Sequence, residues 1–555
     1  MKTRVQELCG LAETAFSSRS NVTSMWQEIS DLFYSERGGF TTSNEISFET
    51  HAQNTNSAPW MFRRELGDTI GSMLRPPGKN WSKLDLMDER LTNEPQNRRG
   101  LDHLHGIFRR AIYSTRSNFS RIAKIADQDW AAFGNCVIEP RMNVTNDGLM
   151  FINHHLRNIA WSQNYDGNID RSYLRWEPTA RQLKSVRAFK GKIHQAVEEL
   201  CDKAPDTVVN CKRIVLPADE YDSYGVTKED RIRGAPKGQF VSIYVDMDNE
   251  AILEEVRIAL FPYTIARWAL PSPYAISPAT YGAIPDARML MRMTLTMIEG
   301  AERAVDPTLI STIDVVRGDI QSFPGGIIQI DRNYDERMGA AIRPLESNSG
   351  SLPFGLDMLQ DLRDRLADMF YLNRINLPPI GEDMTALEVR ERVSEFTRRA
   401  IPLFEPAETD YNGNLCELTF GVMMQAGFFG SMEDLPKELS GGEIKFTFDT
   451  PLRAADDRAK TVAFQEAAQV LSIAAQLDPA IAKSAVRLTP ALRDALRGVQ
   501  APAEWIATDE EIAEAQETEA QAMQAMQAAQ AVSTGAQVAG QVGEAAQSLQ
   551  TAGIV

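Results

Sequence analysis

The chain has 555 residues, and 76 acidic against 58 basic side chains give it a formal charge of -18 at pH 7. At about 100–200 residues per domain, this length predicts three or four structural units. The excess of acid argues against tight non-specific binding of nucleic acid, because such binding needs clustered Lys and Arg that displace counterions from phosphates.

The cysteine pattern and the apolar runs indicate in which cellular compartment the chain folds and whether it contacts a membrane. The five cysteines are odd in number and scattered, with no C-x-x-C pair, which predicts a reduced intracellular protein with free thiols and no structural zinc. Glu7 and Glu13 interrupt the N-terminal apolar pattern, so no signal peptide is expected. The run Leu418–Met432 contains Gln425 and is shorter than the roughly 20 residues of a membrane span. We therefore expect a buried helix there and no membrane contact.

The first half of the chain predicts helices followed by a mixed region. Residues 1–134 carry apolar faces at helical spacing, with Asn21 and Pro59 at helix starts and Gly134 at a helix end. Residues 135–265 predict an α+β pattern rather than regular βαβ alternation. Its expected strands are Cys136–Glu139, Thr207–Leu216 and Gln239–Val245, and its expected helix is Ile193–Leu200.

Two long helices are predicted around a short β insertion. Residues 266–284 are proline-rich and expected to be extended, and Pro285 then starts a helix that ends near Val305. Residues 306–350 predict strands and a Pro324–Gly326 turn. In the second helix, about 355–374, apolar residues at 3-4-3 spacing form a seam that suits packing either between copies of the chain or within one chain. The seam residues are Leu359, Leu362, Leu366 and Met369.

The rest of the chain predicts further helices and one strand. Thr385 and Glu388 form a capping box that starts a third helix. Glu443–Phe448 is an expected strand. The Ala/Gln-rich segment 509–555 is helix-prone in its first half and is interrupted by glycines in its second. Eight acidic residues and no basic ones follow Arg497, so the tail is a candidate anionic collar.

Motifs of catalysis are missing from the sequence. There is no G-x-x-x-x-G-K-[ST], no H-E-x-x-H and no G-x-S-x-G. Asp246–Glu250 lacks the glycine and glutamate of a calcium loop, and the pairs at His103/His105 and His154/His155 do not share a helix face. The basic–aromatic pairs Arg175-Trp176 and Arg267-Trp268 suit ordinary packing. We therefore expect no catalytic residues, no metal and no cofactor.

Four segments of the chain carry a recognisable pattern, in this order: Ala58–Leu66 with Ser72–Trp81, Ser277-Pro278 with Ile284–Arg288, Met384–Val389, and Leu477–Pro479. Together they resemble the portal, or head-to-tail connector, proteins of short-tailed, T7-like bacteriophages. The match lacks an aromatic at Ser82 and has Leu387 where the family has Thr.

The resemblance implies an α+β, mainly α, portal fold that forms a ring of about twelve subunits at one capsid vertex. Double-stranded DNA would pass through its channel during packaging and ejection. The implied parts are a wing (1–265), an entry segment and first stem helix (266–305), a clip (306–350), a second stem helix (351–375), a tunnel loop (376–384), a wing return helix (385–435), a crown (436–507) and a C-terminal barrel helix or disordered tail (508–555).

The implied partners are other copies of the chain, the terminase large subunit, head-to-tail adaptor and tail proteins, major capsid and scaffolding proteins, and internal core proteins. The implied location is the portal vertex of the virion, after assembly in the host cytoplasm. Arg374, Asn376 and Thr385 are candidate DNA-channel residues at the tunnel loop. Two alternatives stay open: a soluble α+β enzyme with a site of dispersed carboxylates, and another virion structural protein such as a head–tail adaptor.

Overall fold

The chain forms two compact units, which we describe separately. The larger consists of Met1–Trp81 and Ala111–Ala426, and the smaller of Ser82–Arg110 and Gly427–Val555. The described part is α+β and mainly helical. The structure is a computed structural model that describes residues 3–42, 46, 52–76, 80–88, 91–92, 94–143, 147–221, 239–269, 272–311, 330, 337, 342–344, 352–372, 406–430, 444–448, 464–469, 492, 495–496, 517–518 and 521–522.

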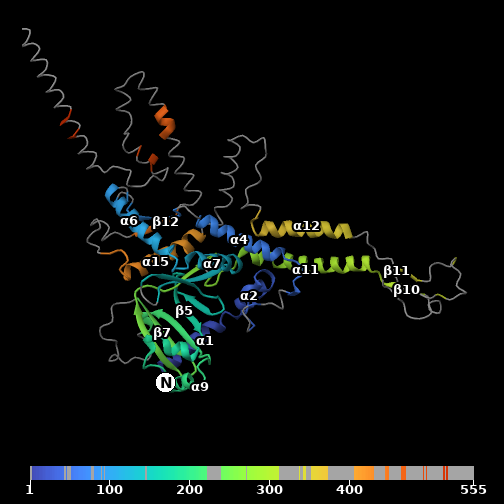
Figure 1. Ribbon diagram of the computed structural model, residues 1–555, viewed down its shortest axis with the longest axis horizontal. Helices are drawn as coiled ribbons and strands as arrows, with labels where there is room; N and C mark the ends of the chain where they lie inside the picture. The colour runs from blue at the N-terminus through green and yellow to red at the C-terminus, as the bar shows by residue number, and fades with distance from the viewer. Residues whose placement is uncertain are drawn as a thin grey trace, which may run out of the picture. The chain divides into compact units, whose positions relative to one another are not determined.

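The larger unit contains most of the described helices and strands (Figure 1). Its helices are α1 (Arg4–Ser17), α2 (Ser20–Phe33), α4 (Ala58–Leu74), α7 (Phe119–Phe133), α8 (Ala180–Ser185), α9 (Gln195–Lys203), α10 (Ala218–Tyr221), α11 (Pro278–Val305), α12 (Leu352–Met369) and α15 (Asn414–Gln425), with 3-10 turns η1 (Ser35–Arg37) and η2 (Arg187–Phe189) and the π-helix η5 (Ala407–Gly413). Its strands are β2 (Asn135–Met142), β3 (Leu149–Asn153), β4 (Ile159–Gln163), β5 (Ile169–Trp176), β6 (Cys211–Pro217), β7 (Phe240–Asp246), β8 (Ala251–Ile258), β9 (Thr264–Arg267), β10 (Leu309–Ser311) and β11 (Ile342–Pro344).

A five-stranded antiparallel sheet runs in the order β4-β5-β6-β7-β8 and is covered on both faces. Alternate residues of a strand point to opposite faces. Ile214 of β6 and Val241 of β7 pack with Leu8 of α1 on one face. Cys211 of β6 packs with Val197 of α9 on the other. The sheet confirms the predicted strands at 207–216 and 239–245 and the predicted helix near 193–200, within a few residues at each end.

A three-stranded sheet in the order β3-β2-β9 also belongs to the larger unit, and its central strand β2 directly follows α7 in the chain. Gly134 ends α7 with a φ of 72°, and a Cβ at this position would lie 2.5 Å from the backbone nitrogen of Ser277. Both the left-handed backbone and the close approach therefore require glycine, as predicted for a helix end. Next to it, the rings of Trp130 and Trp268 stack with centroids 3.9 Å apart.

Two predicted helix starts are wrong, and tertiary contacts explain both. Helix α11 begins at Pro278, so Pro285 lies inside it. The Ser277 hydroxyl donates to the carbonyl of Ala131 (2.7 Å) and the Thr280 hydroxyl to that of Ala132 (2.6 Å), so the last turn of α7 fixes the first turn of α11.

The start of α2 also differs from the prediction. The helix begins at Ser20, and the N-cap position is held by Arg19, not Asn21. The Arg19 guanidinium is buried and donates to the carbonyls of Leu156, Arg157 and Ile159 at 2.6–2.7 Å. These contacts hold Arg19 at the helix start, and no side chain caps the first turn of α2, in contrast to the predicted cap at Asn21.

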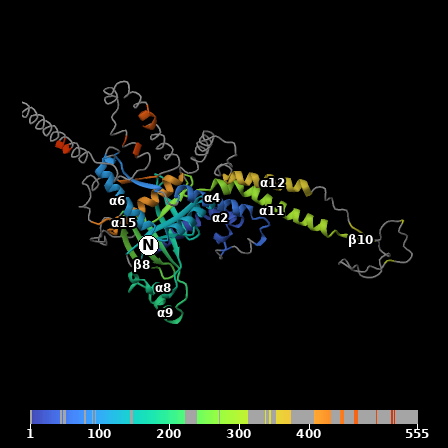
Figure 2. The same ribbon diagram turned by 45° about the horizontal axis from the view of Figure 1, so that its top comes forward.

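Helices α11 and α12 form a hairpin, and Figures 1 and 2 both show them side by side. The second helix spans Leu352–Met369, a few residues earlier than predicted. At the far end of α11, β10 pairs antiparallel with β11, in agreement with the predicted β insertion. The Pro324–Gly326 turn and the third helix from Thr385 lie outside the described residues.

The smaller unit joins two distant segments of the chain. Strand β1 (Ser82–Leu86) pairs antiparallel with β12 (Ile444–Phe448), which confirms the predicted strand. The helix α6 (Pro95–Ile112) begins in this unit, and its Phe108 ring lies 5.0 Å from that of Phe446. Within the ranges given above, no helix is long and apolar enough to cross a membrane.

Candidate functional site

The predicted seam of α12 lies inside a single chain. Leu359, Leu362 and Leu366 are buried, with exposed fractions of 6%, 3% and 0%, and Met369 is half-buried. Facing them, Met297 of α11 occupies the space that a side chain at Gly355 would need. Packing within one chain therefore accounts for these leucines, because side chains that are already buried in the single chain present no surface to a second copy. A contact between copies through this hairpin must use its other faces.

The base of the hairpin is anchored to α2, α4 and the segment before α4. Phe370 is fully buried, and its ring lies 5.5 Å from that of Phe33 and 6.4 Å from that of Phe62. The Thr55 hydroxyl donates to the carbonyl of Met291 at 2.7 Å. Aromatic packing and hydrogen bonds thus hold the hairpin at its base, while its far half carries exposed side chains on both helices.

Three consecutive polar residues of α7 are buried, and each contacts a different arginine. Asp127 pairs with Arg75 at the end of α4, and the Gln128 side chain accepts from Arg63 in the middle of α4. Asp129 accepts two hydrogen bonds from Arg37 of η1, at 2.6 and 3.1 Å. A buried polar group is costly unless it is paired, so these contacts specify how α4 and η1 pack on α7. The sequence analysis missed this Asp127–Asp129 cluster.

Asp127 also connects α7 with the π-helix η5. The Tyr411 hydroxyl donates to the Asp127 carboxylate at 2.9 Å, and Arg75 donates to the Asn412 side chain at 2.5 Å. Burial alone would lower the pKa of Arg75, but the adjacent carboxylate outweighs it and raises the pKa, so the guanidinium stays charged. Gly71 of α4 leaves the space that the carboxylate fills. One ion pair therefore ties three segments together.

A second buried cluster links the two sheets. Glu139 of β2 contacts the His154 ring at 2.7 Å and accepts from Arg213 of β6 at 2.6 Å. Arg213 also donates to the Tyr263 hydroxyl at 3.1 Å. Burial would raise the pKa of Glu139, but its bonds to His154 and Arg213 outweigh burial and lower the pKa to about 2. The carboxylate is fully ionised at neutral pH and acts as a structural link.

Two further buried histidines, His105 and His155, are neutral at physiological pH. Burial and nearby arginines lower the pKa of His155 to about 3, and burial, followed by neighbouring cationic side chains, lowers that of His105 to about 4. Across the residues placed by the structure, no group of three or more His, Cys, Asp or Glu side chains is arranged to hold a metal ion. The five cysteines are free thiols, as predicted.

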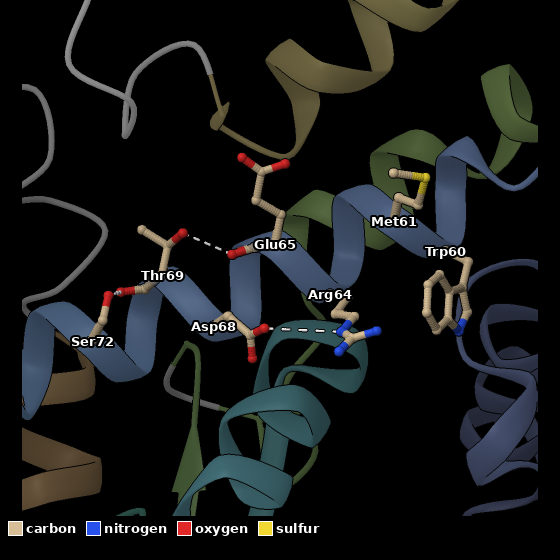
Figure 3. A pocket seen from close by; sticks show the side chains of 7 residues that line it. All are labelled: Trp60, Met61, Arg64, Glu65, Asp68, Thr69 and Ser72. Atoms are coloured by element: carbon tan, nitrogen blue, oxygen red, sulfur yellow. Dashed lines mark hydrogen bonds and ion pairs between the residues drawn. The ribbon is translucent and has the colours of Figure 1, made fainter.

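An open hollow of about 440 Å3 lies along one face of α4 (Figure 3). Its lining includes Trp60, and an ion pair between Arg64 and Asp68 at 3.9 Å crosses it. All seven lining residues belong to this one helix: Trp60, Met61, Arg64, Glu65, Asp68, Thr69 and Ser72. The buried carboxylates Asp127 and Glu139 are not among them. The enzyme alternative requires an enclosed pocket in which titratable groups converge. This open hollow on one helix is not such a pocket.

The basic–aromatic pairs are used in packing, as predicted. Arg267 donates to the Gln163 side chain and the Gly167 carbonyl at 3.1 Å each, and Trp268 stacks in the core. The Trp176 ring lies 5.8 Å from that of Phe189 beside the large sheet. The candidate DNA-channel residues, Arg374, Asn376 and Thr385, lie outside the described residues.

Comparison with known proteins identifies the family. Residues 5–506 match a family model described as bacteriophage head to tail connecting protein. The chain is 24% identical over 453 residues to a probable portal protein of Bordetella phage BPP-1, covering 79% of this chain and 77% of that protein. A chain from a solved virion of a native gene transfer agent particle aligns over 75% of this chain and 86% of its own length at 10% identity, with a TM-score of 0.34. The chain therefore belongs to the bacteriophage head-to-tail connector, or portal, family, and is a structural component of a virion rather than an enzyme.

Proposed function

We propose that the chain forms a closed ring of about twelve copies at one capsid vertex, through which double-stranded DNA enters and leaves the head. Family membership over residues 5–506 carries this proposal. The four sequence segments that resemble the T7-like portals, Met384–Val389 among them, support assignment to the short-tailed lineage.

We assign the parts of such a portal to ranges of this chain. The α11–α12 hairpin is the stem, and the insertion that carries β10 and β11 is the clip, which would face the terminase large subunit and later the adaptor and tail proteins. Residues 1–265 and 385–435 are the wing, and 436–507 the crown. The tunnel loop at 376–384 would bring Arg374, Asn376 and Thr385 to the DNA. Major capsid, scaffolding and internal core proteins are the further partners.

The acidic balance of the chain suits passage of DNA. A strongly basic bore would retain the duplex through its phosphates, whereas a conduit must let the duplex slide. With -18 charges per chain, a ring repels DNA over about 8–10 Å at physiological salt. The acids after Arg497 would form an anionic collar at the C-terminal barrel.

Native mass spectrometry and negative-stain images of the purified chain test the proposal. We expect closed rings of about twelve copies with a central channel. A stable monomer or dimer at high protein concentration, with no rings, would refute it. A second candidate, a head–tail adaptor, shares the virion location, and attachment of the ring to a preformed head instead of incorporation during head assembly would favour it.

A further inference from the structure

The two outward faces of the α11–α12 hairpin differ in charge, and we propose that α11 of one copy docks against α12 of the next copy through these faces. This inference rests on the proposed function, since it names the contact that closes the ring. It concerns surfaces that a single chain leaves exposed.

The outward face of α12 is an acidic stripe. The helix packs on α11, its buried residues Leu359, Leu362 and Leu366 mark its inner side, and the residues about half a turn away face outward. Four aspartates at 4-3-4 spacing occupy that side, and all are exposed. The acidic stripe consists of Asp357, Asp361, Asp364 and Asp368.

The outward face of α11 is basic and apolar. Met297 marks the side of α11 that contacts α12, so the opposite side carries Arg288, Arg292 and Leu295 at 4-3 spacing. All three are exposed, and we call them the basic face. Glu299 and Glu302 lie on the same side of α11 but nearer to β10, beyond the part of α11 that is level with the acidic stripe.

The two faces are in register along the hairpin. Counting equal numbers of residues from the Met297–Gly355 contact along the antiparallel helices, Arg288 is level with Asp364, and Arg292 is level with Gln360, the residue next to Asp361. Rotation about a ring axis that runs along the hairpin leaves heights unchanged. Basic groups of one copy therefore meet acidic groups of its neighbour at the same height.

Exposed apolar side chains extend this match toward β10. Leu295 and Ile298 are each 45% exposed, and Phe354 is 68% exposed. Ile298 and Phe354 are level with each other by the same count. Leu295 lies on the outward side of α11 and Ile298 lies beside that side, about 100° around the helix from Met297. These exposed apolar side chains add apolar area that a contact between neighbouring copies would bury.

Charge complementarity also selects the type of contact. A two-fold contact that pairs α12 with α12 would bring the acidic stripes together, whereas a head-to-tail contact brings opposite charges together and closes into a ring. Arg288 also pairs within the chain with Glu28 of α2, whose side chain is half-buried. The pair of Arg365 with Asp361 is exposed, and such surface pairs contribute little and can rearrange.

Two charge-reversal variants of the full chain test the contact. Variant A is Arg292→Glu, and variant B combines Asp361→Lys with Asp364→Lys. Each alone places like charges on facing surfaces, so we expect the protein concentration for half-maximal ring formation to rise about tenfold or more, most strongly at low salt. An equimolar mixture of A and B should recover rings of alternating copies, because every contact then joins opposite charges.

The control variant is Arg363→Glu, which makes the same change of charge as variant A on the exposed surface of α12, but off the acidic stripe. It should form rings like the unmodified chain. Circular dichroism checks that each variant keeps its helices. Should A or B fail to fold alone, one chain carrying all three substitutions reverses both faces and should still form rings.

The outcomes separate this inference from the proposed function. If the unmodified chain forms no rings, the proposed function fails. If it forms rings and variants A and B assemble as it does, the function stands and the contact is wrong. Loss of rings in A and B without recovery in the mixture or the combined chain would also overturn the contact.

Discussion

Replacement of Asp127 by Asn is the sharpest test of how the α7 cluster holds the larger unit together. The substitution keeps the size of the side chain and removes its charge. Arg75 would remain buried and charged without its counter-ion, since both side chains of the pair are only 5% exposed. Removal of one partner of a buried ion pair costs about 3–5 kcal/mol.

An exposed pair of the same chemistry provides the control. Arg116 and Asp147 lie 2.6 Å apart, but their side chains are 69% and 48% exposed. Water already solvates both groups, so Asp147→Asn should cost less than about 1 kcal/mol. Any general effect of exchanging Asp for Asn is common to both variants.

Urea unfolding followed by tryptophan fluorescence measures the difference. The protein concentration must be fixed, because ring formation adds a concentration-dependent term to stability. We expect the Asp127→Asn midpoint to fall far below that of Asp147→Asn. Equal midpoints for the two variants would refute the assignment of Asp127 as a buried, ionised link.

Four further predictions address other parts of the structure. Glu139→Gln should make the free energy of unfolding less dependent on pH in the acid range. The pKa of Glu139 in the folded protein, about 2, lies below its value in the unfolded chain, so the carboxylate contributes about 3 kcal/mol of stability above pH 4.5, which is lost as the pH falls toward 2. Unfolding free energies measured across this pH range check the prediction. Leu366→Asp places a charge among buried side chains of one chain, so circular dichroism should report a disrupted hairpin in the monomer, and an intact monomer would contradict the placement. Gly71→Ala should lower the melting temperature, because its Cβ would occupy the space of the Asp127 carboxylate, and an unchanged melting temperature would count against that packing. Deletion of 516–555 should leave rings intact in native mass spectra, because this Ala/Gln-rich tail offers little core of its own, and loss of rings would show that the tail is structural.

Strong periodicity and local signals made several elements predictable from sequence. Pro59 lies in the first turn of α4, and Gly134 ends α7 as expected, because each acts through its own backbone. The apolar seam of α12 was also recognised. Periodicity alone does not say which chain covers a seam, and the burial of Leu362 and Leu366 within one chain answers this for those residues.

Elements that depend on distant partners were not predictable. Strand β5, Ile169–Trp176, carries charged residues such as Arg171 and Arg175 among its apolar ones, so its pattern does not resemble a buried strand until its neighbours in the sheet are known. The π-helix η5 and the early start of α11 at Pro278 likewise follow from contacts with α7.

The buried cluster of α7 shows the same limit for a site. Asp127, Gln128 and Asp129 stand together between the apolar residues of the second half of α7, and this polar run was the available signal. Its meaning depended on arginines 52 to 92 residues away in the chain, Arg37 being the farthest. Three consecutive polar residues are equally typical of a solvent-exposed turn of helix, so only the structure shows that these three are buried.

Class-averaged images of the purified chain, viewed down the symmetry axis, test the central claim most directly. The account predicts closed rings of about twelve copies around an open channel. Images that show only monomers or dimers, at concentrations where portal rings should form, would contradict it.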